Sequence, residues 1–239
     1  MASRPAAGGG VWVEVGPNRF VRWCDGFAQR HGGALAEPPR VIADDDACSG
    51  QAIELTAADG STATCCVPFP PLVSAVLDTT AADTAAPDSL IADLAAHALT
   101  SRTIGVLLVR RGGYAVGVFE GLRLTDSKVG ARHVQGRTKA GGWSQQRFAR
   151  RREGQAREAY AAAADTAARI LLPHTARLDA LVIGGDAGAL SALRSDPRLK
   201  SVWDKEIGPQ LNVGDPKMAD LQKAPDHFRA IRIRLVERS

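Results

Sequence analysis

The chain of 239 residues has an ordinary globular composition, with 45% hydrophobic and 23% charged residues and a formal net charge of +4. Its apolar runs all fall short of the ~18 residues that a membrane-spanning helix needs, which argues against a helical membrane protein. The charge is uneven, because residues 1–100 carry 5 basic and 12 acidic side chains and residues 101–239 carry 25 and 14. We therefore expect a nucleic-acid partner to meet the C-terminal part.

The cysteines bear on the redox environment. All four lie in the first third of the chain: Cys24, Cys48, Cys65 and Cys66. No C-x-x-C pair is present to begin a zinc site, and the first ten residues lack the apolar core of a secretion signal. We therefore expect a cytoplasmic protein with reduced, partly buried thiols, and neither a metal site nor a disulfide.

The first 80 residues predict a small α+β domain of unknown role. Residues 11–15 have the pattern of a strand, and residues 17–31 carry apolar side chains at helical spacing. Strands are predicted over 38–42, 52–56 and 63–67, joined by turns rich in Asp and Gly. The three aspartates of the first turn are interpreted as solvated carboxylates and not as metal ligands. Residues 81–89, small and polar, are the expected linker.

Residues 90–239 predict a second domain, of the α/β class, in which strands and helices alternate. A helix over 90–99, with Asp88 or Ser89 as N-cap, precedes a hairpin of strands 103–109 and 114–120. A third strand over 121–125 leads into a glycine-rich loop at 127–147. The later elements follow in chain order: a helix over 144–172, a strand over 178–183, a helix over 187–193 capped by Asp186, a strand over 210–213, a helix beginning at Asp215-Pro216, and a half-buried strand over 229–236.

The segment 127–152 has the charge expected of an RNA-binding loop. It carries eight Lys or Arg, no Asp or Glu, and four glycines. Phosphate neutralisation supplies most nucleic-acid affinity, so this composition predicts a contact with RNA. Cations in the first turns of a helix oppose its macrodipole, which again favours an anionic partner. The candidate phosphate contacts are Arg132, Arg137, Lys139, Arg147, Arg150, Arg151 and Arg152.

At this loop the sequence resembles the middle, peptide-releasing domain of the class I release factors of eukaryotes and archaea. The pattern of that family is a basic glycine-rich loop, Gly-Gly-Gln-Ser, and then Arg-Phe-Ala-Arg opening a long helix. The residues that match it are Gly141-Gly142, Ser144 and Arg147-Phe148-Ala149-Arg150. The resemblance covers roughly residues 95–239. It implies a ribonuclease-H-like mixed sheet with flanking helices for that part of the chain.

Within that superfamily the chain is most similar to the VLRF-type (Vms-like) release factors in their actinobacterial form. Their Gly-x-x-Gln signature is matched by Gly142-Trp143-Ser144-Gln145. Trp143 stands where other release factors have glutamine directly after Gly-Gly, which leaves Gln145 and Gln146 as candidates for the catalytic amide. Gln145 is favoured because it alone fits the signature spacing. The resemblance does not extend to a stop-codon-reading or C-terminal partner-binding domain, which implies rescue of stalled chains and not codon-directed termination.

The chemistry agrees with these residue types. Hydrolysis of a peptidyl-tRNA ester needs a water held against the carbonyl carbon and a donor for the developing oxyanion. Glutamine is no base near pH 7, so Gln145, together with Gly142, would position the water and donate a hydrogen bond to the oxyanion. Trp143 is interpreted as a residue that stacks on a base or ribose. His133 is more typical of a structural or phosphate-facing residue than of a general base. The supporting loop residues are Gly141, Trp143, Ser144, Gln146 and His133.

The expected function is therefore a ribosome-associated peptidyl-tRNA hydrolase without metal or organic cofactor. Its expected partners are the peptidyl-transferase centre of the large ribosomal subunit, peptidyl-tRNA and rRNA, with no membrane, and we expect a monomer. One alternative is a non-catalytic ribosome- or RNA-binding module of the same fold. Another is a metal nuclease on a ribonuclease-H-like fold, which needs several carboxylates converging on Mg²⁺, and the loop has none.

Overall fold

The computed structural model describes residues 4–6, 9–44, 48, 50–72, 87–131 and 143–238, apart from the side chains of residues 87, 88, 143–152 and 209. The chain forms two compact units. Unit 1 consists of residues 1–100 and 225–239, and unit 2 of residues 101–224. Unit 1 has a formal charge of −5 and unit 2 of +9, so the excess of positive charge belongs to unit 2.

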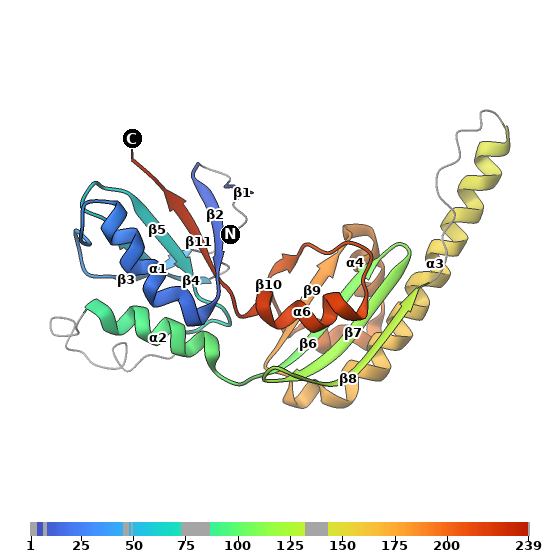
Figure 1. The fold of residues 1–239 in the computed structure, drawn as a ribbon. Coiled ribbons are helices and arrows are strands. Elements are labelled where there is room, and N and C mark those ends of the chain that lie inside the picture. The colour runs from blue at the N-terminus through green and yellow to red at the C-terminus, as the bar shows by residue number, and fades with distance from the viewer. Residues whose placement is uncertain are drawn as a thin grey trace. The chain divides into compact units, whose positions relative to one another are not determined.

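Unit 1 is an antiparallel sheet with two helices on one face (Figure 1). Its six strands, in spatial order, are β1 (Arg4–Pro5), β2 (Val11–Val15), β11 (Ile231–Val236), β5 (Thr62–Cys66), β4 (Gly50–Thr56) and β3 (Arg40–Asp44). The helices are α1 (Pro17–Arg30) and α2 (Pro87–Leu99). The core between sheet and helices includes Phe20, Phe27, Ile53, Leu94 and Ile233. The strands and first helix expected in residues 1–80 are present, with ends shifted by up to a few residues.

The division into units differs from the expected boundary at residues 81–89. Helix α2 packs against α1, and β11 lies between β2 and β5, so both belong to unit 1. The alternation expected in β11 is present, since Ile231, Ile233 and Leu235 are buried and the arginines between them are not. Arg229, just before β11, also bonds to the end of α2. Its guanidinium donates to the carbonyl oxygens of the last two residues of α2 and of the residue after it: Ala98, Leu99 and Thr100.

One sequence-based expectation for unit 1 is wrong. Cys48 and Cys66 form a disulfide, with their sulfurs 2.09 Å apart. Cys66 pairs with Ala52 in the β4–β5 ladder, and Cys48 lies in the connection from β3 to β4, so the fold brings the two together. Cys24 and Cys65 are free and buried, as expected of thiols. Burial raises the pKa of Cys24 to about 12 and that of Cys65 also well above its ordinary value.

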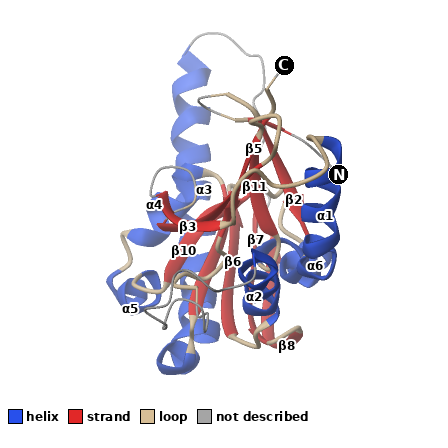
Figure 2. Cartoon of the chain, turned by 90° about the vertical axis from the view of Figure 1, so that its left-hand side faces the viewer, coloured by secondary structure: helices blue, strands red, loops and turns tan. Residues whose placement is uncertain are grey.

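Unit 2 contains a mixed five-stranded sheet (Figure 1 and Figure 2). In spatial order its strands are β8 (Arg123–Ala131), β7 (Gly113–Glu120), β6 (Thr103–Arg110), β9 (Ala180–Gly185) and β10 (Glu206–Leu211). β7 is antiparallel to both neighbours, whereas β9 is parallel to β6 and β10. Numbered along the chain the order is 3-2-1-4-5 with the second strand reversed, which is the ribonuclease-H-like arrangement, so the expected fold class is confirmed.

The helices of unit 2 are α3 (Trp143–Leu171), the 3₁₀ turn η1 (Leu172–Arg177), α4 (Ala187–Arg194), the 3₁₀ turn η2 (Pro197–Leu199), α5 (Lys200–Trp203) and α6 (Met218–Phe228), which runs on into unit 1. α3 and α4 pack on one face of the sheet, with Ala167 and Leu190 in a core shared with Val116 and Ile183. α6 begins later than expected because Asp220 accepts a hydrogen bond from the Lys217 backbone nitrogen (2.9 Å), which places the cap after Pro216.

Candidate functional site

The basic loop is shorter than the sequence suggests. β8 runs to Ala131, because its ladder with β7 continues until Ala131 pairs with Gly113, and α3 already begins at Trp143. Residues 127–131 of the expected loop are therefore strand, and residues 143–147 are helix. The connection between them is residues 132–142, which lie outside the described part of the chain.

The structure places the expected site residues in two groups. Six lie outside the described residues: Arg132, His133, Arg137, Lys139, Gly141 and Gly142. The others occupy the first turns of α3, where the backbone is described and the side chains are not: Trp143, Ser144, Gln145, Gln146, Arg147, Arg150, Arg151 and Arg152. Successive helix positions are rotated by about 100°, so positions 145 and 146 do not lie on the same side of the helix. In Figure 1 the first turns of α3 extend beyond the strands of unit 2.

The strand that enters the loop is fixed by a packing contact that the sequence analysis missed. Tyr114 on β7 pairs with Gly130 on β8, and a Cβ at Gly130 would overlap the tyrosine ring. The Tyr114 hydroxyl accepts a hydrogen bond from the hydroxyl of Thr166 on α3 (3.1 Å). Gly130 therefore serves close packing and not loop flexibility. A buried threonine in an alanine-rich helix was the available signal.

Asp186 links the start of α4 to the turn between β6 and β7. Its Oδ1 accepts from the Ala189 nitrogen (2.8 Å), which confirms the expected N-cap of α4, and its Oδ2 accepts from the Arg111 nitrogen in the β6–β7 turn (2.9 Å). The charges of Asp186 and Arg111 both act on the hydroxyl group of Tyr160 on α3. Burial is the main cause that raises the pKa of Tyr160, the Asp186 carboxylate adds to it, and Arg111 opposes it.

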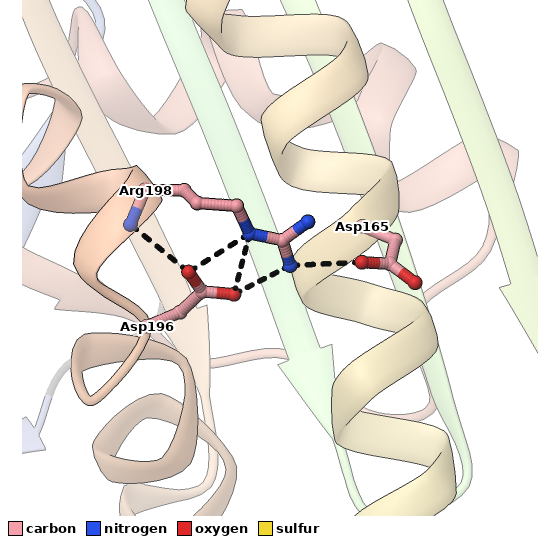
Figure 3. Close-up of polar contacts among 3 residues, drawn as sticks. All are labelled: Asp165, Asp196 and Arg198. Atoms are coloured by element: carbon pink, nitrogen blue, oxygen red, sulfur yellow. Dashed lines mark hydrogen bonds and ion pairs between the residues drawn. The ribbon is translucent and has the colours of Figure 1, made fainter.

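α3 is also joined to η2, by an arginine held between two carboxylates (Figure 3). Nε of Arg198 donates to both oxygens of Asp196 (3.0 and 3.1 Å), and Nη2 donates to Asp196 (2.6 Å) and to Asp165 on α3 (2.8 Å). These contacts raise the pKa of Arg198, and the Arg198 guanidinium lowers the pKa of Asp196. The helix that carries the candidate glutamines is thus bonded to the sheet through Thr166 and Tyr114, and to η2 through Asp165 and Arg198.

Among the described residues no three His, Cys, Asp or Glu side chains are grouped so that they could hold an ion. Within the same residues no helix is both long and apolar enough to cross a membrane. The arrangement offers a basic connection, a helix N-terminus and two amides.

The sequence of residues 102–234 matches the family model of the actinobacteria/chloroflexi VLRF1 release factors. That match covers more than half of the chain. The protein belongs to this family. The matched range takes in all strands of unit 2 and ends within β11, so it includes a strand that completes the sheet of unit 1. The family is one of release factors, which supports a role in translation termination or rescue.

Two solved structures show weaker similarity. One is the archaeal translation termination factor aRF1, with 18% identity and a TM-score of 0.38, covering 48% of this chain and 31% of that one. The other is described only as an archaeal protein, with 16% identity and a TM-score of 0.37, covering 56% of this chain and 35% of that one. The chain thus matches about a third of the length of each. No curated protein matches.

Proposed function

We propose that the protein is a cytoplasmic, ribosome-associated peptidyl-tRNA hydrolase that releases stalled nascent chains. The observation that carries this proposal is the position of the Gly142-x-x-Gln145 motif within a release-factor family member. Gly142 ends the basic connection, and Gln145 is the third residue of α3. The motif therefore spans the junction between a segment suited to RNA and a long helix fixed to a sheet.

The role of Gln145 follows from its chemistry. Its amide both donates and accepts hydrogen bonds, so it can hold a water against the ester carbonyl and donate to the oxyanion. The first backbone N–H groups of a helix have no partners within the helix, so α3 adds further donors near this position. Gly142 and Gly141 allow close approach of the backbone to the substrate. No metal or organic cofactor is part of the proposal.

The loop cations and Trp143 bind the RNA in this proposal. Arg132, Arg137 and Lys139 in the connection would neutralise phosphates of rRNA or of the peptidyl-tRNA. Trp143 would stack on a base or ribose, and Ser144, Gln146 and His133 would support the loop. The proposed partners are the large subunit at its peptidyl-transferase centre, with one copy of this chain per ribosome.

The proposal is tested by mixing the full chain with a stalled ribosomal complex that carries labelled peptidyl-tRNA. Wild-type protein should release the peptide, and EDTA at a concentration that leaves the ribosome intact should not stop it. Release that requires an added divalent ion beyond the needs of the ribosome would contradict the metal-free mechanism.

A second function remains in competition because Trp143 occupies the position that glutamine has in other release factors. In that case the chain is a non-catalytic ribosome- or RNA-binding module. It would bind the stalled complex and leave the ester intact, with or without Gln145. Binding without release by wild-type protein would favour the module over the hydrolase.

A further inference from the structure

A groove of about 500 Å³ lies on unit 2 between α3 and the segment formed by α4 and η2. One wall is α3, which contributes Arg157, Tyr160 and Ala161, and the other contains Ser195 and Arg198. Arg157 and Ala161 are exposed, and Tyr160 is half-buried. The groove is separate from the catalytic motif and contains none of the residues assigned to it.

The side chains of the groove suit a phosphodiester backbone. Arg198 is fixed in place by Asp196 and Asp165, and these contacts use Nε and Nη2 and leave Nη1 outside them (Figure 3). An arginine that is already oriented loses little side-chain entropy when it binds a further anion. The two carboxylates offset the charge of the Arg198 guanidinium, so Arg198 would contribute mainly the N–H groups of Nη1 and the attraction for a phosphate would come mainly from Arg157. Arg157 adds a positive charge, and Tyr160 adds an aromatic ring of the kind on which bases stack.

The position of the groove along α3 relates it to the loop. Arg157 is twelve residues after Gln145, which corresponds to ~18 Å along a helix. Helix positions seven apart return to nearly the same side, so the groove lies on the side of α3 that carries position 150. RNA that contacts the first turns of α3 on this side would meet the groove next.

We propose that this groove binds the phosphodiester backbone of ribosomal RNA, with Arg157 and Arg198 on phosphates and Tyr160 against a ribose or base. The inference rests on the proposed function, because it assumes that the loop enters an RNA-lined site. It adds a second anchoring point about 18 Å along α3 from position 145, which would fix the direction of α3 as well as the position of its first turn.

The test measures binding of the full chain to isolated large ribosomal subunits at several salt concentrations. Arg157→Glu should weaken binding about tenfold or more and lower the slope of log K against log salt by about 1. Arg169→Glu is the matched control, since Arg169 is an exposed arginine on the same helix but outside the groove. Equal binding losses for the two variants would overturn the proposal, because they would reflect general charge alone. Thermal unfolding of both variants checks that they fold.

A cross-link identifies what occupies the groove. Ala161→Cys places an exposed thiol in it, while Cys24 and Cys65 are buried and Cys48 and Cys66 are bonded to each other. With a photoreactive label at this position, the expected product on the large subunit is a cross-link to rRNA. A cross-link mainly to a ribosomal protein would overturn the assignment to RNA.

Failure of this inference and failure of the hydrolase proposal have different signatures. If wild-type protein releases no peptide but Arg157→Glu still loses binding relative to Arg169→Glu, the hydrolase is refuted and the groove stands. If wild-type protein releases peptide and the two variants bind alike, the groove is refuted and the hydrolase stands.

Discussion

At the scale of single residues, two glycines of unit 2 have opposite roles. Gly130 lies under the Tyr114 ring, where a Cβ would overlap ring atoms, whereas a Cβ at Gly154 in α3 would meet nothing within 4 Å. The sequence shows both only as glycines near a basic segment. The difference lies in a cross-strand partner, Tyr114, that is sixteen positions away from Gly130 along the chain.

Gly130→Ala should destabilise the protein by ~1–3 kcal/mol, because a well-packed contact must be forced apart. Gly154→Ala is the control and should raise stability by ~0.5–1 kcal/mol, since alanine is the better helix residue in open space. Denaturant unfolding of the full chain measures both. The cost of Gly130→Ala should shrink in a Tyr114→Ala background, and an undiminished cost there would contradict the packing account.

The cysteines give a second prediction at this scale. Cys24 and Cys65 should resist alkylation in the native protein at neutral pH, because burial raises their pKa values and blocks access. Cys48 and Cys66 should react only after reduction of their disulfide. Mass spectrometry of protein alkylated before and after reduction counts the labels. Labelling of Cys48 without reductant would contradict the disulfide.

At the scale of elements, the C-terminal segment links α2 to the sheet of unit 1. The last carbonyl groups of a helix have no partners within the helix, and Arg229 donates to two of them, those of Ala98 and Leu99, and to the carbonyl of Thr100 just after α2. A cation near a helix C-terminus also interacts favourably with the macrodipole. The segment that supplies Arg229 continues directly into β11, so one short stretch of chain both caps α2 and adds a strand to the sheet.

Arg229→Met should destabilise unit 1 by ~1.5–3 kcal/mol, the usual range for hydrogen bonds that involve a charged group. The control is Arg22→Met, which removes an exposed arginine from α1. Denaturant unfolding again provides the measurement. Equal midpoints for the two variants would show that the contacts at the end of α2 contribute nothing measurable.

At the scale of the whole molecule, the sequence predicted the order of helices and strands along the chain better than it predicted which of them contact one another. The ribonuclease-H-like sheet followed from the alternation of strands and helices together with the family resemblance. The sequence did not predict which sheet β11 joins. The alternation of Ile231, Ile233 and Leu235 with arginine specifies a half-buried strand and says nothing of its neighbours. The disulfide and the Tyr114–Gly130 contact likewise depend on partners brought together by the fold. The side-chain geometry of Gln145 lies outside the described part of the chain and stays a prediction.

Acid should destabilise the molecule through carboxylates in both units. The hydrogen bond with His227 is the main cause that lowers the pKa of Glu14, and contacts with the Ser61 backbone and the Arg198 side chain lower those of Asp59 and Asp196. A carboxyl with a lowered pKa in the folded state contributes stability above its unfolded pKa and loses it as the pH falls through its folded pKa. The denaturant concentration at the unfolding midpoint should therefore fall as the pH is lowered below about 4, near the ordinary carboxyl pKa. Glu14→Gln should show a smaller drop than wild type, and an identical pH profile would contradict the role of Glu14.

The most direct test of the account is the single-turnover rate of peptide release from a stalled ribosomal complex, compared for wild type, Gln145→Ala and Gln146→Ala. All three are used at concentrations that saturate the complex, so that rate and binding are separated. If Gln145 is the catalytic amide, Gln145→Ala should lower the rate ~10²–10³-fold, the usual cost of one well-placed donor, and Gln146→Ala should change it much less. A Gln145→Ala variant that releases peptide at the wild-type rate would contradict the catalytic role of Gln145.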